Sequence, residues 1–239
     1  LLQAWVTSLS FTLQLYFDFS GYTDMALGSA LVFNIRLPEN FNSPYKALNI
    51  RDFWRRWHMS LSRFLLDYIY IPLGGNRSGL LRTCINLITT FFLCGLWHGA
   101  GWTFIFWGLL NGIALIVHHF WLKTEFKMHY FFSGALTFLF VNFAWVFFRA
   151  DEWKNAVQIL TAMLGFNGVG AFELLPALYI LFFLGIVFGA KNSMQWARQV
   201  NTKTEAIYIA LFLAFFSLLQ LNNFQISNNK TMEFLYFNF

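Results

Sequence analysis

Charged side chains are scarce in this chain: they make up 11% of its 239 residues, against about 25% in soluble domains. Apolar residues make up 58%, above the roughly 45–50% of a soluble domain. This composition excludes an ordinary aqueous domain and predicts a membrane protein. The aromatic excess, with 32 Phe and 10 Trp, fits lipid-facing helices and interface belts.

Cysteine is also scarce. The only two, Cys84 and Cys94, lie in one apolar segment at a spacing that suits neither a zinc site nor a disulfide, so we interpret both as packing residues. No histidine has the i, i+4 pairing or the carboxylate neighbours of a metal site, and we predict no metal. No serine lies in a Gly-x-Ser-x-Gly elbow, so a serine-hydrolase triad is not supported.

The basic residues give the chain a formal net charge of +5. They lie in short loops between apolar runs rather than on one solvated face, so we attribute them to membrane topology and predict no nucleic-acid partner. Three loops, placed on one side, hold all but three of the 16 basic residues: 36–82, 122–129 and 191–204. That side is expected to be cytoplasmic.

Seven apolar segments are candidate crossings or part-crossings of the bilayer: 1–17, 22–35, 83–97, 102–121, 130–149, 172–190 and 205–221. The segment from residue 83 is shorter than the roughly 20 residues of a full crossing, which predicts that His98 lies inside the membrane. The sequence Gly99-Ala100-Gly101 then lets the chain reverse. Irregular backbone at membrane depth needs cover from protein or a water-filled cavity, so we expect a tunnel beside His98.

Residues 36–82 are more polar and less regular than the rest. Pro and Asn residues begin this segment, and Pro72, Gly74 and Gly75 predict a turn near its end. Between them, residues 52–70 alternate arginines with Phe, Trp and Leu. This pattern predicts an amphipathic helix that lies at the interface or re-enters the membrane.

Two Trp-His pairs lie forty positions apart, at residues 57–58 and 97–98. An ionisable side chain at membrane depth is costly, so a functional role is the first hypothesis. A neutral imidazole can take a proton from a hydroxyl and return it to a leaving group, which makes His98 a candidate general base. The alternatives are a packing role for His98 and an interfacial position for His58. The remaining histidines are interpreted as interface residues: His118, His119 and His129.

Seven ordered motifs resemble one family: residues 16–26, 37–45, 52–62, 70–77, 94–103, 144–150 and 234–239. They resemble the membrane-bound O-acyltransferases, and more closely the bacterial branch that acetylates alginate or peptidoglycan. The resemblance implies an all-α, polytopic integral membrane protein whose helices form a ring around a central tunnel. Residues 1–239 resemble the C-terminal part of such a domain, with the N-terminal helices absent, and the chain begins without Met.

The same resemblance implies an O-acyltransferase, most closely an acetyltransferase. It would pass acetyl groups from a cytoplasmic thioester donor, acetyl-CoA or an acyl carrier protein, towards an exopolysaccharide or cell-wall glycan. No bound cofactor is implied. The expected location is the bacterial cytoplasmic (inner) membrane, with lipids, the donor or carrier protein, and a secreted or membrane-anchored acetyltransferase as partners. D-alanyl transfer to teichoic acid is the sibling reaction.

The resemblance also assigns roles to residues. His98 matches the family's catalytic histidine, and His58 matches a second polar position that is Asn or His in different branches. Expected substrate-binding residues are two tryptophans and three arginines: Trp57, Trp97, Arg55, Arg56 and Arg63. His58 and Trp57 would position the donor thioester or polarise its carbonyl, and the arginines would face phosphates of a carrier or of lipid headgroups.

Two further points belong to this hypothesis. Asn111 stands where many relatives are expected to carry another histidine. A rival hypothesis from another class is a transporter or channel-like subunit whose histidines relay protons or line a substrate path.

Overall fold

The computed structural model describes residues 1–170, 174–200, 202–205 and 207–211, and within these ranges the regular structure is helical throughout. The chain divides into two compact units, residues 1–190 and 191–239. The first unit holds α1 (Leu2–Val32), α2 (Ile50–Trp54), α3 (Met59–Leu65), α4 (Gly79–His98), α5 (Trp102–Trp121), α6 (Tyr130–Arg149), α7 (Trp153–Met163) and α8 (Leu174–Gly189). The second unit contains α9 (Ser193–Ala197).

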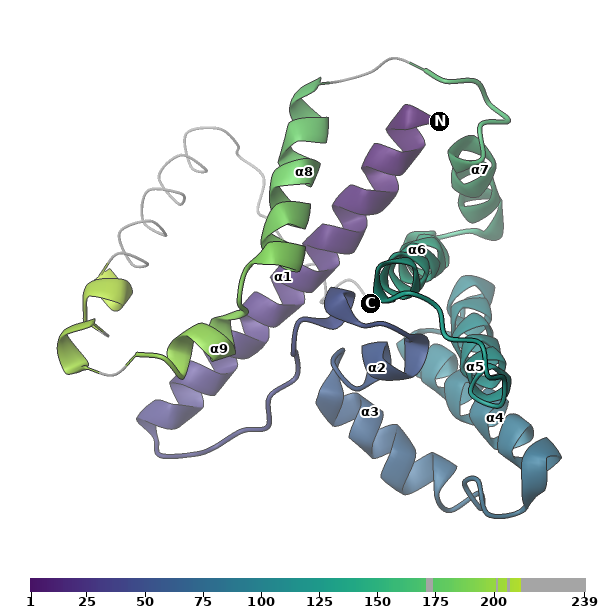
Figure 1. Cartoon of the computed structure of the whole chain (residues 1–239), viewed down its shortest axis with the longest axis horizontal. Coiled ribbons are helices and arrows are strands. Elements are labelled where there is room, and N and C mark those ends of the chain that lie inside the picture. The colour runs from purple at the N-terminus through teal and green to yellow at the C-terminus, as the bar shows by residue number, and fades with distance from the viewer. Residues whose placement is uncertain (171–173, 201, 206, 212–239) are drawn as a thin grey trace. The chain divides into compact units, whose positions relative to one another are not determined.

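Three helices of the first unit are long and apolar enough to cross a membrane: α4, α5 and α6, each of 20 residues. A helix of this length extends about 30 Å, which matches the hydrocarbon core. α5 lies against both α4 and α6 (Figure 1). The prediction of an all-α, multi-pass membrane protein is therefore confirmed.

The start of α4 corrects one step of the sequence analysis. The helix begins at Gly79 rather than near residue 83, because Arg82 is accommodated within it and its Nε donates to the carbonyl of Leu73 at 3.3 Å. With 20 residues, α4 is long enough for a full crossing. Helix length therefore does not place His98 inside the membrane. The predicted reversal is confirmed, since α4 ends at His98 and α5 begins at Trp102.

A second correction concerns α1, which is one helix of 31 residues where the sequence suggested two segments, 1–17 and 22–35. Gly21 lies inside this helix without ending it. The N-terminal half of α1 is fixed to α6 by polar contacts, in which the hydroxyls of Ser8 and Thr12 donate to Asn142 Oδ1 at 3.0 and 2.8 Å.

The prediction of one continuous amphipathic helix over residues 52–70 is wrong. The structure has α2, a break at residues 55–58, α3, and a π-helical turn over Leu66–Tyr70. The break arises because the segment turns inward: the Trp54 ring packs at 5.0 Å from Phe91 of α4 and 5.9 Å from Trp107 of α5. Packing against two helices that are long and apolar enough to cross a membrane favours the re-entrant interpretation over the interfacial one.

The helices α4 and α5 approach each other closely at two glycines. A Cβ on Gly95 would overlap the carbonyl oxygen of Phe104, and a Cβ on Gly108 would overlap that of Phe91. Small residues allow membrane helices to approach in this way, because lipid provides no hydrophobic force to drive them together. The glycine contact sets the position of the end of α4, and so of His98.

The remaining elements of the first unit close around α1. The backbone N–H of Leu2 donates to Val169 at 3.1 Å, and the Trp5 indole N–H donates to the carbonyl of Met163 at 3.0 Å, which ties α1 to the end of α7. Phe17 of α1 meets Phe183 of α8 at 5.4 Å. Most of the predicted crossing at 205–221, and the motif at 234–239, lie outside the described residues.

Candidate functional site

His98 is the last residue of α4, and its imidazole is half-buried among aromatic rings. Its ring centroid lies 5.2 Å from Trp107 of α5 and 5.0 Å from Phe148 of α6, both edge-on. The next residue has an extended backbone, and a Cβ there would come within 2.9 Å of the Phe104 ring. Gly99 is thus required by crowding, and it ends the helix with His98 facing α5 and α6.

His58 lies in the break between α2 and α3, with φ 42° and ψ 58°. This left-handed conformation is uncommon for non-glycine residues, among which Asn, Asp and His adopt it most often. The His58 ring meets Phe19 of α1 edge-on at 4.9 Å, and its Nδ1 lies 3.4 Å from the Ser60 hydroxyl. Burial lowers the pKa of His58 to about 4, so the imidazole is neutral at pH 7.

A continuous series of aromatic rings joins the two histidines. The His58 ring contacts Phe19, Phe19 contacts Phe41, and Phe41 contacts Trp57, with ring centroids 4.9, 5.0 and 5.1 Å apart. From Trp57 the series continues through Trp145 and Phe148 to His98, with centroids 5.0, 5.2 and 5.0 Å apart. The fold therefore brings two segments that are forty residues apart into one site.

The two predicted tryptophans occupy different environments. Trp57 is buried and stacks on Phe53 at 5.7 Å and on Tyr45 at 6.0 Å. Trp97 is 62% exposed, although its ring lies 4.8 Å from His98. Trp57 is therefore part of the packed core that supports the site, whereas the Trp97 ring borders His98 from the outside.

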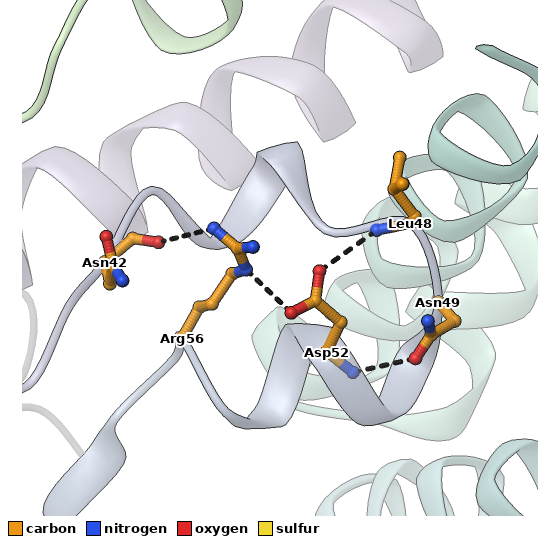
Figure 2. A network of polar contacts seen from close by, with 5 residues as sticks. All are labelled: Asn42, Leu48, Asn49, Asp52 and Arg56. Atoms are coloured by element: carbon orange, nitrogen blue, oxygen red, sulfur yellow. Dashed lines mark hydrogen bonds and ion pairs between the residues drawn. The ribbon is translucent and has the colours of Figure 1, made fainter. Parts of the chain in front are cut away.

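The three predicted arginines also differ. Arg55 and Arg63 are exposed, as expected of groups that face a phosphate or lipid headgroups. Arg56 is instead held within the protein, as Figure 2 shows: its Nε donates to Asp52 Oδ1 at 2.8 Å, and its guanidinium donates to the backbone oxygen of Asn42 at 3.4 Å. The Asn49 side chain caps the same short helix by accepting from the Asp52 N–H at 2.8 Å.

Because Arg56 is held in this network and Arg55 is exposed, substitutions of the two residues should have different effects. Arg56→Gln should lower stability by about 1 kcal/mol, because it removes a partly buried ion pair. Arg55→Gln should change stability by less than about 0.5 kcal/mol. Thermal unfolding of the two purified variants in detergent measures the difference. If Arg55 binds donor phosphates, Arg55→Gln raises KM for the donor without changing the unfolding temperature; equal destabilisation by both substitutions would contradict the assignment.

Sequence reasoning singles out Asn111 but does not predict the contact by which it fixes α2 in place. The Trp54 indole N–H donates to Asn111 Oδ1 at 3.2 Å, and the Asn111 amide donates to the carbonyl of Trp107 at 2.9 Å. Asn111 is 2% exposed in the middle of α5. The sequence did carry a signal for it, because a polar side chain inside an apolar crossing needs a partner. At this position the expected histidine is replaced by an amide that joins α2 to α5.

The other histidines stand apart from the site. His118 and His119 lie in the last turn of α5, the end of that helix remote from His98. His129 precedes α6 and its Nδ1 accepts from the N–H of Phe131 at 3.3 Å. Within the described ranges, no group of three or more His, Cys, Asp or Glu side chains could hold a metal ion.

The comparisons with known proteins agree with the geometry. Residues 1–150 match the sequence model of the membrane-bound O-acyltransferase (MBOAT) family. The chain is 61% identical over 172 residues to the peptidoglycan O-acetyltransferase of Helicobacter pylori, covering 70% of this chain and 33% of that protein. It is 39% identical over 265 aligned positions to the probable alginate O-acetylase AlgI of Pseudomonas putida, covering 99% and 53% respectively. The teichoic acid D-alanyltransferase of Bacillus subtilis is 33% identical over 160 residues, covering 61% and 40%.

The spanning helices and the family match define an integral membrane protein of an acyltransferase class. The chain belongs to the membrane-bound O-acyltransferase family. It spans about a third to a half of the length of the first two relatives. Both histidine motifs lie within the matched residues 1–150.

Proposed function

We propose that this protein is a membrane O-acyltransferase that passes acetyl groups from a cytoplasmic thioester across the bacterial cytoplasmic membrane to an exopolysaccharide or cell-wall glycan. The observation that carries the proposal is that His58 and His98 lie at the two ends of one series of contacting aromatic rings within the family-matched residues. The names of the two first relatives, an O-acetyltransferase and an O-acetylase, support acetyl as the group transferred.

In the proposed mechanism His98 is the general base. Its neutral imidazole takes the proton from the acceptor hydroxyl while the hydroxyl oxygen forms a bond to the thioester carbonyl carbon. The carbon–sulfur bond breaks, and the imidazolium returns the proton to the departing thiolate. The edge-on contacts with Trp107 and Phe148 support this role, because they hold the ring in one orientation.

His58 and Trp57 are proposed to position the donor thioester or polarise its carbonyl. The two exposed arginines, Arg55 and Arg63, would bind phosphates of the donor or of lipid headgroups. Trp97 would border the path of the substrate to His98. The expected partners are the thioester donor or its carrier protein on the cytoplasmic side and a second acetyltransferase on the other side.

Release of thiol tests the function directly. The full-length protein, purified in detergent and supplied with acetyl-CoA or an acetylated carrier protein together with a glycan acceptor, should release free thiol in proportion to acetyl transferred. A transporter or channel-like subunit would instead move substrate across a proteoliposome membrane without releasing thiol. D-alanyl transfer, supported by the teichoic acid relative, would appear as preference for a D-alanyl thioester.

Substitution of His58 should have a graded effect. His58→Asn should retain activity within about tenfold of the wild type, because its amide preserves hydrogen bonding, whereas His58→Leu should lose more than that. The rate of thiol release measures both, after size-exclusion chromatography has shown that each variant is folded. Equal loss in the two variants would show that His58 does more than form a hydrogen bond.

A further inference from the structure

Asn40 and Ser60 form a series of polar contacts that leads to Nδ1 of His58. Asn40 Oδ1 accepts two hydrogen bonds from one residue, from the Ser60 backbone N–H at 3.1 Å and from the Ser60 hydroxyl at 2.6 Å. The Ser60 hydroxyl oxygen in turn lies 3.4 Å from His58 Nδ1. A further hydrogen bond, from the Met59 N–H to the backbone oxygen of Asn40 at 3.0 Å, holds the loop around Asn40 against the start of α3.

The direction of each hydrogen bond follows from the first. A backbone N–H can only donate, so the Asn40 atom that faces Ser60 is the amide oxygen and not the amide nitrogen. At 2.6 Å from this oxygen, the Ser60 hydroxyl must give its single proton to Asn40. The Ser60 oxygen can then only accept from His58, so Nδ1 of His58 must carry a proton.

We propose that Ser60 and Asn40 are positioning residues that hold His58 as its Nδ1-protonated tautomer, so that Nε2 presents a lone pair to the substrate. This inference rests on the proposed function for the identity of the substrate, but the tautomer itself does not depend on it. The Phe19 ring, whose centroid lies 4.9 Å from that of the imidazole, restricts rotation of the His58 ring and helps to keep Nδ1 beside the Ser60 hydroxyl.

The tautomer decides between the two roles proposed for His58. A neutral imidazole that is protonated on Nδ1 has no proton on Nε2, and a low pKa keeps it neutral at pH 7. It cannot donate to a thioester carbonyl and so cannot polarise it. It can accept a hydrogen bond, either from the acceptor hydroxyl or from an amide N–H of the donor's arm. Asparagine can accept in the same way through Oδ1.

The test is nitrogen NMR of the full-length protein labelled with 15N-histidine, in which the His58 signals are those lost in His58→Asn. The wild type should show Nδ1 protonated and Nε2 unprotonated. Ser60→Ala removes the acceptor and should produce a mixture of tautomers or a switch to Nε2–H. Ser60→Thr should restore the wild-type signals. Ser62→Ala is the matched control, since the Ser62 hydroxyl donates to the carbonyl of Trp57 at 3.2 Å rather than to His58.

Kinetics then identify the bound group. Ser60→Ala should lower kcat/KM by about five- to tenfold, the effect of one hydrogen bond, while Ser62→Ala changes it less than twofold. An increase in KM for the glycan acceptor would show that Nε2 accepts from the hydroxyl, and an increase in KM for the thioester would show that it accepts from the donor. Asn40→Asp retains the acceptor oxygen and should keep the tautomer, whereas Asn40→Leu should lose it.

Two NMR results would overturn the inference: a wild-type His58 protonated on Nε2, or an unchanged tautomer in Ser60→Ala. Failure of the proposed function has a different signature. In that case the wild type releases no thiol, yet the Nδ1–H signal and its dependence on Ser60 are still present.

Discussion

His98→Ala is expected to abolish acyl transfer, with a loss of about 10²–10⁴-fold, the range that general acid–base catalysis contributes. His98→Gln should fail almost as badly, because an amide can form hydrogen bonds but cannot carry a proton through the cycle. Thiol release under single-turnover conditions measures both. The ring occupies the end of α4 between Trp107 and Phe148, so glutamine fills the space better than alanine and is the stricter test.

The control for this loss is a histidine outside the site. His118 lies at the other end of α5, and His118→Gln should leave the rate within about twofold, as expected of a residue that contacts neither substrate nor base. Near-normal turnover in a folded His98→Gln protein, together with inactivity of His58→Asn, would reverse the roles assigned to the two histidines.

The second large effect is expected at the contact between α4 and α5. In Gly108→Ala the new Cβ would overlap the carbonyl oxygen of Phe91 and lie 3.2 Å from Gly95 Cα, so the helices must separate. Overpacking of this kind costs about 1–3 kcal/mol. The separation also moves the end of α4, where a displacement of the reacting group by about 1 Å can cost 10²-fold in rate. We expect lower yields, a lower unfolding temperature and a large fall in kcat.

Gly21→Ala provides the comparison. Gly21 is also helical, but no atom lies within 4 Å of the position that its Cβ would take. The exchange should stabilise α1 by up to about 1 kcal/mol through helix propensity and leave kcat unchanged. If Gly108→Ala matched the wild type in unfolding temperature and kcat, the close helix contact would not be what positions His98.

The sequence predicted the regular crossings well and the irregular segment poorly. The spans 102–121 and 130–149 coincide with α5 and α6, because each is a continuous apolar run with a glycine turn or a charged loop beside it. The sequence divides the long helix α1 at the polar residues around Gly21, but in the structure the helix continues through them, and its buried residues lie between Ser8 and Thr23. Local composition could not show this, since the partners of α1 come from α6 and α8.

The residues of the candidate site could likewise be predicted only in part. His58 and His98 could be selected from the sequence because an ionisable group among apolar residues is unusual and because both lie in family motifs. Trp145 and Phe148, which connect them, lie about fifty residues beyond His98, and no periodicity links them to it. Ser60 and Asn40 could not be paired either, because their contact depends on the break in the predicted helix at residues 55–58.

The left-handed backbone at His58 limits which side chains evolution or mutagenesis can place there. A β-branched or bulky residue would pay a steric penalty whatever its chemistry, whereas Asn and His are among the non-glycine residues that tolerate this conformation best. Histidine and asparagine thus both tolerate this backbone conformation and can both accept the hydrogen bond. His58→Gly separates these demands: it relieves the backbone and removes the acceptor, so a folded but slow His58→Gly protein would show that the side chain, and not the shape of the turn, is what the reaction requires.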